Sequence, residues 1–340
     1  MANTNVQVPT PGKLLQVSTA FWASKALSSA VELGVFTQLA KAPASCAELS
    51  KAVGINHRGA RDLFDALVSL GFLLRENDIY KNTPEAAFYL DENSVDYIGG
   101  FLTMIGGRNY NAWGRLTEAL KTGTHQNEGK DDPDMFAKMY SDPEVLRNFL
   151  EAMTGISRGT AKHIAAAFDL AKYDSFVDVG CAQGGATVEI AKAAPEVNGA
   201  GFDLPVVAPI FNEYVAKHNL SERVKFIAGD FFKDELPETD VILMGHILHD
   251  WDLEQKKMLL QKAQRALRPG GVLLVYDTMI DDERRENTMG LLMSLNMLIE
   301  TPGGFDYTGA DLLSWMQDSG FSDITLKQLN PAHSLAIARK

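Results

Sequence analysis

Two histidines stand three residues apart at the end of a predicted strand. In the segment MGHILHDWD, residues 244–252, His246 and His249 follow a short apolar run that is typical of a buried strand. Imidazole has an ordinary pKa of about 6.5, so it can take up a proton near neutral pH, and it is also a common metal ligand. The pair therefore has three interpretations: a general base, a metal site, or packed residues of the core.

The rest of the sequence argues against a metal site. The chain has two cysteines, Cys46 and Cys181, and neither lies at metal-binding spacing from the histidines. We therefore expect no metal. We interpret His249 as the candidate base, with a buried histidine bonded to the backbone as the alternative, and His246 as a residue packed in the same pocket. Trp251 is expected to wall the site, although a core tryptophan would look the same in sequence.

The composition is that of a globular protein with an acidic balance. The chain has 340 residues, enough for two domains, of which 46% are hydrophobic, and its formal net charge is −12. A negative chain repels a phosphate backbone, so nucleic acid is not an expected partner. Two cysteines cannot form a disulfide framework, and the first residues lack the pattern of a signal peptide. We expect a cytoplasmic protein without a membrane partner.

The N-terminal part predicts a winged helix-turn-helix. An amphipathic segment at 14–40 precedes two short helices, expected at 46–53 and 57–70, and a hairpin that turns at Asn77 and Asp78. Such units often bind DNA, but residues 1–92 hold eight Lys or Arg against nine Asp or Glu. We therefore expect dimerisation or packing rather than DNA binding.

From Ser175 onward, strand and helix patterns alternate. Residues 93–170 are expected to be mostly helical, with a polar surface loop at 121–134. The alternation predicts an α/β fold with an open, largely parallel, doubly wound sheet, followed by two more strands at the C-terminal end. The expected strands cover 175–180, 198–204, 224–230, 240–245 and 271–277, and the expected helices cover 185–195, 206–218 and 252–267.

Ligands of such sheets bind at the carboxyl ends of the strands. Small residues at 180–184 follow the first strand, and Asp203 ends the second strand, where it can accept hydrogen bonds from ribose hydroxyls. Both features also fit NAD. The Gly-Asp-Phe motif at 229–231 adds a carboxylate and an aromatic ring suited to adenine, which favours a nucleoside without a pyrophosphate. The alternative is that these acids cap the following helices.

The motif series resembles that of the plant-type small-molecule O-methyltransferases and their bacterial relatives. The motifs are DVGCAQGG, GFDLP, GDFF, LHDW, RPGG and GGFDYT, and the resemblance extends from about residue 14 to the end. It implies a winged-helix dimerisation domain at 1–100, a helical linker at 101–165, and a Rossmann-like class I methyltransferase domain at 166–340. It also implies S-adenosyl-L-methionine as cofactor, a hydroxylated small-molecule acceptor, and a homodimer.

The resemblance also implies roles for single residues. His249 matches the family's general base, and Asp277 and Asp306 stand where the family usually has two glutamates. Because aspartate is shorter by one methylene, its contact with the imidazole could be lost or mediated by water. The implied cofactor-binding residues are Asp178, Gly180, Asp203, Leu204, Gly229, Asp230, Phe231 and Gly245, the last of which stands where plant members often have lysine.

The acceptor pocket is expected to involve the segment TMGLLMSLNMLIE, residues 288–300. Methionines recur there every four residues, a spacing that usually marks core, but the equivalent helix of the family lines the acceptor pocket. The candidate acceptor-binding residues are Trp113, Phe149, Met153, His246, Trp251, Met289, Met293, Asn296 and Met297.

These residue types suit methyl transfer, in which catalysis is mostly the positioning of two reactants. An imidazole takes the acceptor proton, and a carboxylate behind the ring fixes its tautomer. Three alternatives stay open from sequence: the same fold and cofactor used for chemistry without methyl transfer, methylation of a nitrogen or carbon instead of an oxygen, and a winged-helix regulator.

Overall fold

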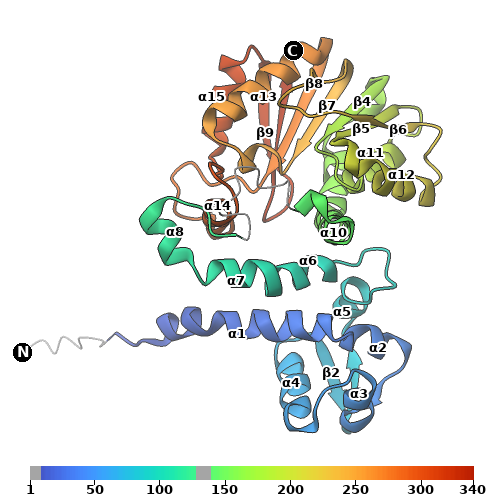
Figure 1. Ribbon diagram of the computed structural model, residues 1–340, viewed down its shortest axis with the longest axis vertical. Helices are drawn as coiled ribbons and strands as arrows, with labels where there is room; N and C mark the ends of the chain where they lie inside the picture. Colours follow the sequence, from blue (N-terminus) through green and yellow to red (C-terminus); the bar gives the residue numbers. More distant parts are fainter. Residues whose placement is uncertain (1–8, 128–138) are drawn as a thin grey trace, which may run out of the picture. The chain divides into compact units, whose positions relative to one another are not determined.

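The computed structural model describes residues 9–127 and 139–340 (Figure 1). The chain forms two compact units, Met1–Gly107 and Arg108–Lys340. The expected surface loop at 121–134 lies partly outside the described residues. No helix in the described ranges is long and apolar enough to cross a membrane.

The first unit contains the predicted winged helix. Its three-stranded sheet has the order β1-β3-β2, with antiparallel neighbours. Helices α2, α3 and α4 surround a core that includes Phe36, Phe64 and Tyr80. The elements are α1 (Gly12–Glu32), α2 (Val35–Lys41), β1 (Ala44–Ser45), α3 (Cys46–Ala52), α4 (His57–Ser69), β2 (Leu73–Glu76), β3 (Ile79–Asn82), α5 (Pro84–Tyr89) and α6 (Gly99–Met104).

Local sequence signals explain why these elements begin and end where they do. Ser45 and Glu48 form a reciprocal capping box at the start of α3, which satisfies two amide groups that the helix leaves open. Asn56 accepts a hydrogen bond from the amide of Arg58 and starts α4. The hairpin turns at Asn77 and Asp78, both in the left-handed region, as predicted.

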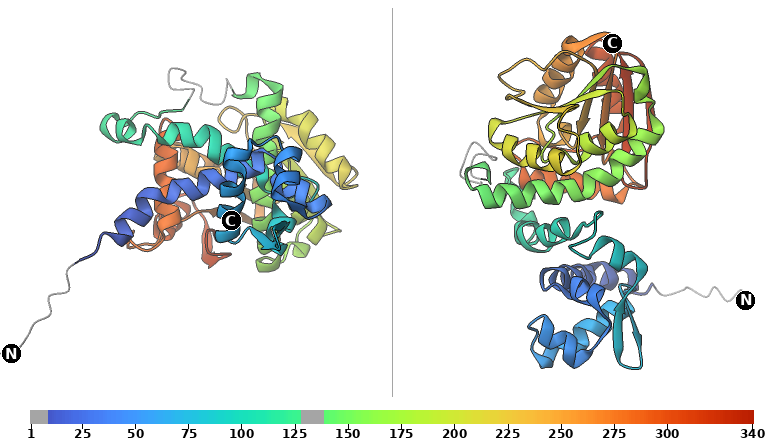
Figure 2. Two further views of the ribbon diagram at one scale, coloured as in Figure 1. Left: turned by 90° about the horizontal axis from the view of Figure 1, so that it is seen from below. Right: turned by 90° about the vertical axis from the view of Figure 1, so that its right-hand side faces the viewer.

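The second unit is a mixed seven-stranded sheet with helices on both faces (Figures 1 and 2). The strand order is β6-β5-β4-β7-β8-β10-β9; the first five strands are parallel and β10 is antiparallel to both neighbours. The predicted doubly wound sheet and its two C-terminal strands are confirmed. The strands are β4 (Ser175–Val179), β5 (Asn198–Asp203), β6 (Val224–Ala228), β7 (Thr239–Gly245), β8 (Leu267–Asp277), β9 (Ser322–Gln328) and β10 (Ser334–Arg339).

Alternating side chains of the strands feed two cores. Phe176 and Val241 pack on the face covered by α10, α11 and α12, whereas Val177 and Ile242 pack on the face covered by α13 and α15. The helices of this unit include α7 (Tyr110–Trp113), α8 (Leu116–Thr122), α10 (Pro143–Ala167), α11 (Gly185–Ala193), α12 (Ala208–Lys217), α13 (Leu253–Ala266), α14 (Thr288–Glu300) and α15 (Gly309–Asp318), and a π-helical turn, η1 (Ile105–Asn109), precedes α7.

Helix α15 is one element that the sequence reading did not predict. Its start is marked by a capping box between Thr308 and Asp311, a signal that is visible in sequence. The helix packs Leu312 and Met316 against the same core as α13. In this way α15 anchors the preceding loop, which carries Asp306, over the carboxyl ends of β7 and β8.

Candidate active site

A sharp turn at the end of β7 places His249 over the sheet. His246, directly after the strand, has a φ of 55°, and its amide donates to the carbonyl of Tyr276 at 3.1 Å. A short 3-10 turn, Leu248–Asp250, follows and buries His249, whose side chain is 7% exposed. At Gly245, a Cβ would lie 2.0 Å from the Tyr276 ring, so Tyr276 occupies the space that a larger residue would need.

Two carboxylates approach the His249 imidazole from different elements. Oδ1 of Asp306 lies 3.3 Å from Nδ1 of His249, within hydrogen-bonding distance, and Oδ1 of Asp277, at the end of β8, lies 3.8 Å from the same nitrogen. The structure therefore brings together the three predicted catalytic side chains. Although aspartate is shorter than glutamate, Asp306 still makes a direct hydrogen-bond contact with the imidazole. Asp277 lies just outside hydrogen-bonding distance.

The glycines of the GGFDYT segment allow this approach. A Cβ at Gly304 would lie 2.5 Å from the carbonyl oxygen of His249, so this loop fits against the turn only without a side chain there. Three residues after Gly304, Tyr307 donates its hydroxyl to Oδ2 of Asp277. The loop thus supplies one carboxylate and orients the other.

The electrostatics of the cluster favour a protonated imidazole. Burial alone would lower the pKa of His249, but the carboxylates of Asp277 and Asp306 outweigh it and raise that pKa to about 10. Burial raises the pKa of Asp277 to about 7, although the neighbouring His249 opposes the shift. Asp250 adds a third carboxyl, whose Oδ1 lies 3.7 Å from Nε2 of His249.

His246 joins the same cluster. Its Nδ1 lies 3.7 Å from Oδ1 of Asp277, and its ring contacts those of His249, Tyr276 and His333. Burial, with the neighbouring histidines, lowers the pKa of His246 well below its ordinary value. Ligand atoms of His246, His249 and Asp277 lie within 4.8 Å of one another, a spacing that a metal ion could also use. That no metal binds here remains a prediction, and it can be tested by measuring activity in the presence of a chelator.

The loop after β4 has the backbone of a ligand-binding turn. Gly180, Ala182 and Gly184 all have positive φ values, and a Cβ at Gly180 would lie 2.2 Å from Ile247. Asp203, at the end of β5, faces this loop: Oδ2 accepts from the amide of Ala182 at 2.9 Å, and Oδ1 accepts from the amide of Leu204 at 2.7 Å. Each oxygen keeps a lone pair for a further donor, which is what two ribose hydroxyls require.

Aromatic rings gather after β6. Phe231 and Phe232 pack edge-on against Trp251, with ring centroids 5.8 Å and 4.5 Å away. Trp251 had been expected on the acceptor side, but its ring packs against Phe231, which is proposed for adenine, and against the neighbouring Phe232. Asp230 accepts from the amide of Phe232 at 2.9 Å and pairs with the exposed Lys233.

Two further predicted cofactor residues act in the packing around these loops. The buried carboxylate of Asp178 accepts from the hydroxyl of Thr187 at 2.6 Å and so ties β4 to α11, and burial raises its pKa to about 7. At Gly229, a Cβ would lie 2.4 Å from the ring of Phe202.

Among the predicted acceptor residues, Trp113 and Asn296 are in contact. Trp113 Nε1 donates to Oδ1 of Asn296 at 2.8 Å, and Nδ2 of Asn109 approaches the same oxygen at 3.3 Å. The Asn296 amide nitrogen reaches Sδ of Met293 at 3.9 Å, and Met297 is buried. The Asn296 amide on α14 is therefore the centre of a small group of polar contacts on a mostly apolar helix face.

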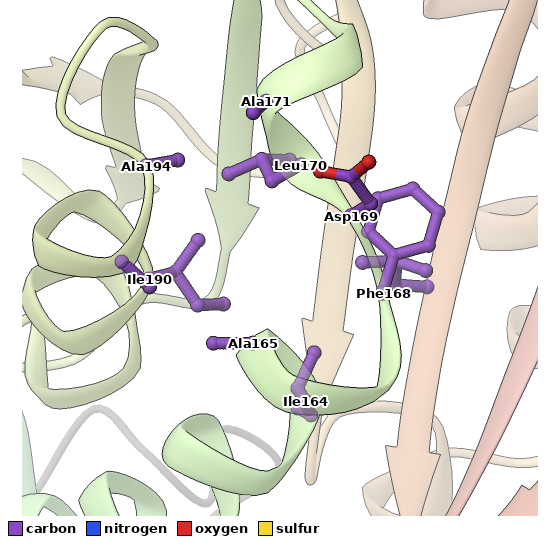
Figure 3. Close-up of a pocket in the computed structure, with 10 residues that line it drawn as sticks. Ile164, Ala165, Phe168, Asp169, Leu170, Ala171, Ile190 and Ala194 are labelled. Carbon is purple, nitrogen blue, oxygen red and sulfur yellow. The ribbon is translucent and has the colours of Figure 1, made fainter.

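Other predicted acceptor residues lie apart from this group. Met289 is 52% exposed, Phe149 on α10 is partly buried against the core, and Met153 is half-buried on the same helix. A separate cavity of about 70 Å³ lies between the end of α10 and α11, with Ile164, Ala165 and Ile190 in its lining (Figure 3). It is far smaller than pockets for drug-sized ligands, which reach several hundred Å³.

Sequence reasoning missed several groups around His249. Tyr307 stands within a motif that was recognised, but its bond to Asp277 is a tertiary contact. His333, on the turn between β9 and β10, had no motif to mark it. Lys256 had a signal: it lies three, four and seven residues before Leu259, Leu260 and Ala263, on the apolar face of its helix.

Comparison with known proteins finds two matching family models and several similar relatives. Residues 113–322 match the family model of the O-methyltransferase domain, and residues 15–92 match that of the O-methyltransferase dimerisation domain. The tetracenomycin polyketide synthesis 8-O-methyl transferase of Streptomyces glaucescens is 43% identical over 331 residues, 97% of each chain. The N,N-dimethyltransferase OxyT of Streptomyces rimosus is 39% identical over 269 residues, covering 79% of this chain and 78% of that protein. The structure of human N-acetylserotonin methyltransferase in complex with SAM superposes with a TM-score of 0.91 at 29% identity, over 100% of this chain and 99% of that one.

Proposed function

The chain belongs to the O-methyltransferase family and is an S-adenosylmethionine-dependent O-methyltransferase, and from this premise we propose that His249 is the base that deprotonates the acceptor hydroxyl. The observation that carries the proposal is the 3.3 Å contact between Nδ1 of His249 and Asp306. Because a carboxylate accepts hydrogen bonds, we place the Nδ1 proton toward Asp306 and propose that Nε2 takes the acceptor proton.

The residues at the strand ends fit an adenosyl group. Asp203 offers two carboxylate oxygens to the ribose, and the glycine turn at 180–184 presents backbone amides beside it. Phe231 and Trp251 supply aromatic surface for the adenine ring. The bound cofactor supplies a methyl group on a positively charged sulfur. Leu204, Gly229, Asp230 and Gly245 complete the proposed cofactor-binding set, with Asp178 holding the turn.

The role of the cluster around His249 is to hold and then release a proton. Asp306 fixes the imidazole, and Tyr307 fixes Asp277 behind it. As Nε2 takes the acceptor proton, both carboxylates stabilise the imidazolium that forms. Because the His249 side chain is only 7% exposed, the ring is shielded from competing water.

The proposed acceptor is an aromatic, polyketide-like compound with a free hydroxyl. Its support is the 43% identity to the tetracenomycin 8-O-methyl transferase, together with an acceptor helix that combines methionine with Asn296. Thioethers adapt to flat rings of variable shape, and an amide can bind a ring oxygen. Trp113 orients that amide.

We propose further that two copies associate through the first unit. Large apolar side chains are exposed along the first half of α1: Leu14 is 75% exposed, Val17 68% and Trp22 64%. A row of this kind marks a protein interface more often than a free surface. Val17 and Trp22 lie within residues 15–92, the segment that matches the dimerisation-domain family model.

The function is tested by incubating the protein with S-adenosylmethionine and a panel of phenolic polyketides, with and without EDTA. We expect a mass gain of one methyl group, about 14 Da, with one S-adenosylhomocysteine formed per product and no loss in EDTA. Products altered without a mass gain of this size, or methylation only of amines, would refute the proposal.

A further inference from the structure

Hydrogen bonds from two neighbours fix the orientation of the Asn296 side-chain amide. An amide can offer either its oxygen or its nitrogen to a ligand, and the groups around it decide which of the two is available. Oδ1 of Asn296 accepts from the indole nitrogen of Trp113 at 2.8 Å, and an indole N–H can only donate. The oxygen of this amide is therefore already used within the protein.

Asn109, at the end of the π-helical turn before α7, donates to the same oxygen. Its Nδ2 lies 3.3 Å from Oδ1 of Asn296 and 3.3 Å from Oε1 of Glu300. Glu300 is paired with Arg108 at 2.7 Å, and a carboxylate in an ion pair can only accept hydrogen bonds. The contact with Glu300 therefore requires the nitrogen of Asn109, and not its oxygen, at this position.

Asn109 keeps this orientation although it leaves a buried polar atom without a partner. The residue is 4% exposed, and its Oδ1 bonds to no group within residues 9–127 and 139–340. A flip of the amide would turn that oxygen toward the oxygens of Glu300 and Asn296, which both accept. The two bonds made by the Asn109 nitrogen therefore outweigh the cost of its unpartnered oxygen.

Apolar packing holds Trp113 against α14. Side chains of α7 and α8 form a small buried core with Ile299 of α14, and Trp113 packs against it. Helix α14 also contacts the 3-10 turn that carries His249. The amide of Asn296 therefore stands on a supported helix next to the proposed base.

The nitrogen of the Asn296 amide is the group that remains for a ligand. The residue is half-buried, and within the described residues its Nδ2 makes one hydrogen bond, a contact of 3.9 Å with Sδ of Met293. A thioether is a weak acceptor, so a carbonyl oxygen of a ligand is a better partner for this nitrogen. The polar group that α14 offers to an acceptor is thus a hydrogen-bond donor.

We propose that Asn109 and Glu300 are positioning residues that fix Asn296 as a hydrogen-bond donor, and that the enzyme thereby selects phenolic acceptors with a ring carbonyl. The inference rests on the proposed function and adds the chemical feature that is recognised. The carbonyl oxygen of a quinone or aryl ketone accepts this bond, whereas an analogue without it leaves the N–H unpaired, which disfavours its binding. Asn109 and Glu300 act through Asn296 and do not touch the acceptor.

The experiment compares the binding of 2-hydroxyanthraquinone and 2-hydroxyanthracene, which differ in their ring carbonyls, by calorimetry on the full-length protein with S-adenosylhomocysteine. We expect wild type to bind the quinone at least about tenfold more tightly. Asn296→Asp keeps the oxygen that Trp113 and Asn109 bind but replaces the outward donor by an acceptor, so the preference should disappear. Asn109→Leu should reduce the preference, whereas Asn111→Leu, at an exposed position on α7, is the matched control and should keep it. Using the same two ligands in every variant cancels their difference in hydroxyl acidity.

Equal affinity of wild type for the two ligands, no binding of the quinone, or a preference that survives in Asn296→Asp overturns the proposal. A second measurement needs no ligand: in protein isotope-labelled at the tryptophan nitrogens, the NMR signal of the Trp113 indole is assigned by its loss in Trp113→Phe. It should move in Asn296→Leu, which removes its acceptor, and stay close to wild type in Asn296→Asp; an unmoved signal in Asn296→Leu also overturns the proposal. A quinone preference without any methyl transfer would retain the recognition and overturn only the proposed function.

Discussion

Asp306 and His249, 57 residues apart in the chain, meet in a buried contact of 3.3 Å between Oδ1 and Nδ1. The turn after β7 supplies the imidazole, and the loop anchored by α15 supplies the carboxylate. This pair links the fold to the proposed chemistry, because the loop that carries Asp306 packs directly against the turn that carries His249.

The pH dependence of turnover should reflect this pair. The pKa of His249 is raised to about 10, so the neutral imidazole, which is the form that accepts a proton, becomes more abundant as the pH rises toward that value. We expect turnover of an acceptor with a high hydroxyl pKa to increase from pH 7 to about pH 9. An acceptor that is already ionised at pH 7 is the control, and its rate should change little. A rate that falls over this range would contradict the assignment.

The two aspartates should differ in importance. Asp306→Asn removes the carboxylate in contact with Nδ1, and we expect a loss of roughly 10- to 100-fold in turnover with a pH profile moved to lower pH. Asp277→Asn should cost less, because that carboxylate stands at 3.8 Å. Steady-state kinetics with saturating cofactor would measure both. Equal effects, or a shift to higher pH, would contradict the geometry.

Asp203 should determine cofactor affinity. We expect Asp203→Ala to bind S-adenosylhomocysteine at least about tenfold more weakly, equivalent to about 1.4 kcal/mol, because a charge-assisted hydrogen bond is lost. Isothermal titration calorimetry gives the affinity, and Asp169→Ala, at an exposed position beside the small cavity of Figure 3, is the control. Unchanged affinity in Asp203→Ala would remove this residue from the site.

The exposed row on α1 should govern self-association. Trp22→Glu introduces a charge at a residue that is 64% exposed in the single chain, and a buried interface there would be destabilised. We expect wild type to sediment as a dimer at micromolar concentration and Trp22→Glu to shift toward the monomer. Leu120→Glu, at a 59% exposed leucine outside residues 15–92, is the matched control. A monomeric wild type would contradict the proposal.

Much of the fold could be predicted because its signals are local. The strands from β4 to β8 alternate with helices. The hairpin turn is indicated by two adjacent residues, Asn77 and Asp78, which both adopt positive φ. Helix α15 was missed although Thr308 and Asp311 mark its start. Strand β8 also begins at Leu267 rather than 271, since Leu267 pairs with Thr239 across an irregularity in the parallel register.

The candidate site could be predicted only in part, because its contacts join distant segments. The strand-end positions of Asp203 and His249 follow from the alternation, but the approach of Asp306 depends on a loop packed against the turn after β7. Similarly, nothing local places Trp251 beside Phe232 rather than on the acceptor side. Only the spacing of Lys256 within an apolar helix face could have indicated its burial.

The most direct test of the account is the turnover of His249→Ala with a phenolic acceptor whose hydroxyl is un-ionised at the assay pH. We expect folding and S-adenosylhomocysteine affinity to match wild type, and turnover to fall by about 10²- to 10⁴-fold, the usual contribution of a general base. His246→Ala, in the neighbouring turn, should lose less. Wild-type turnover by His249→Ala on this acceptor would contradict the assignment of His249 as the base.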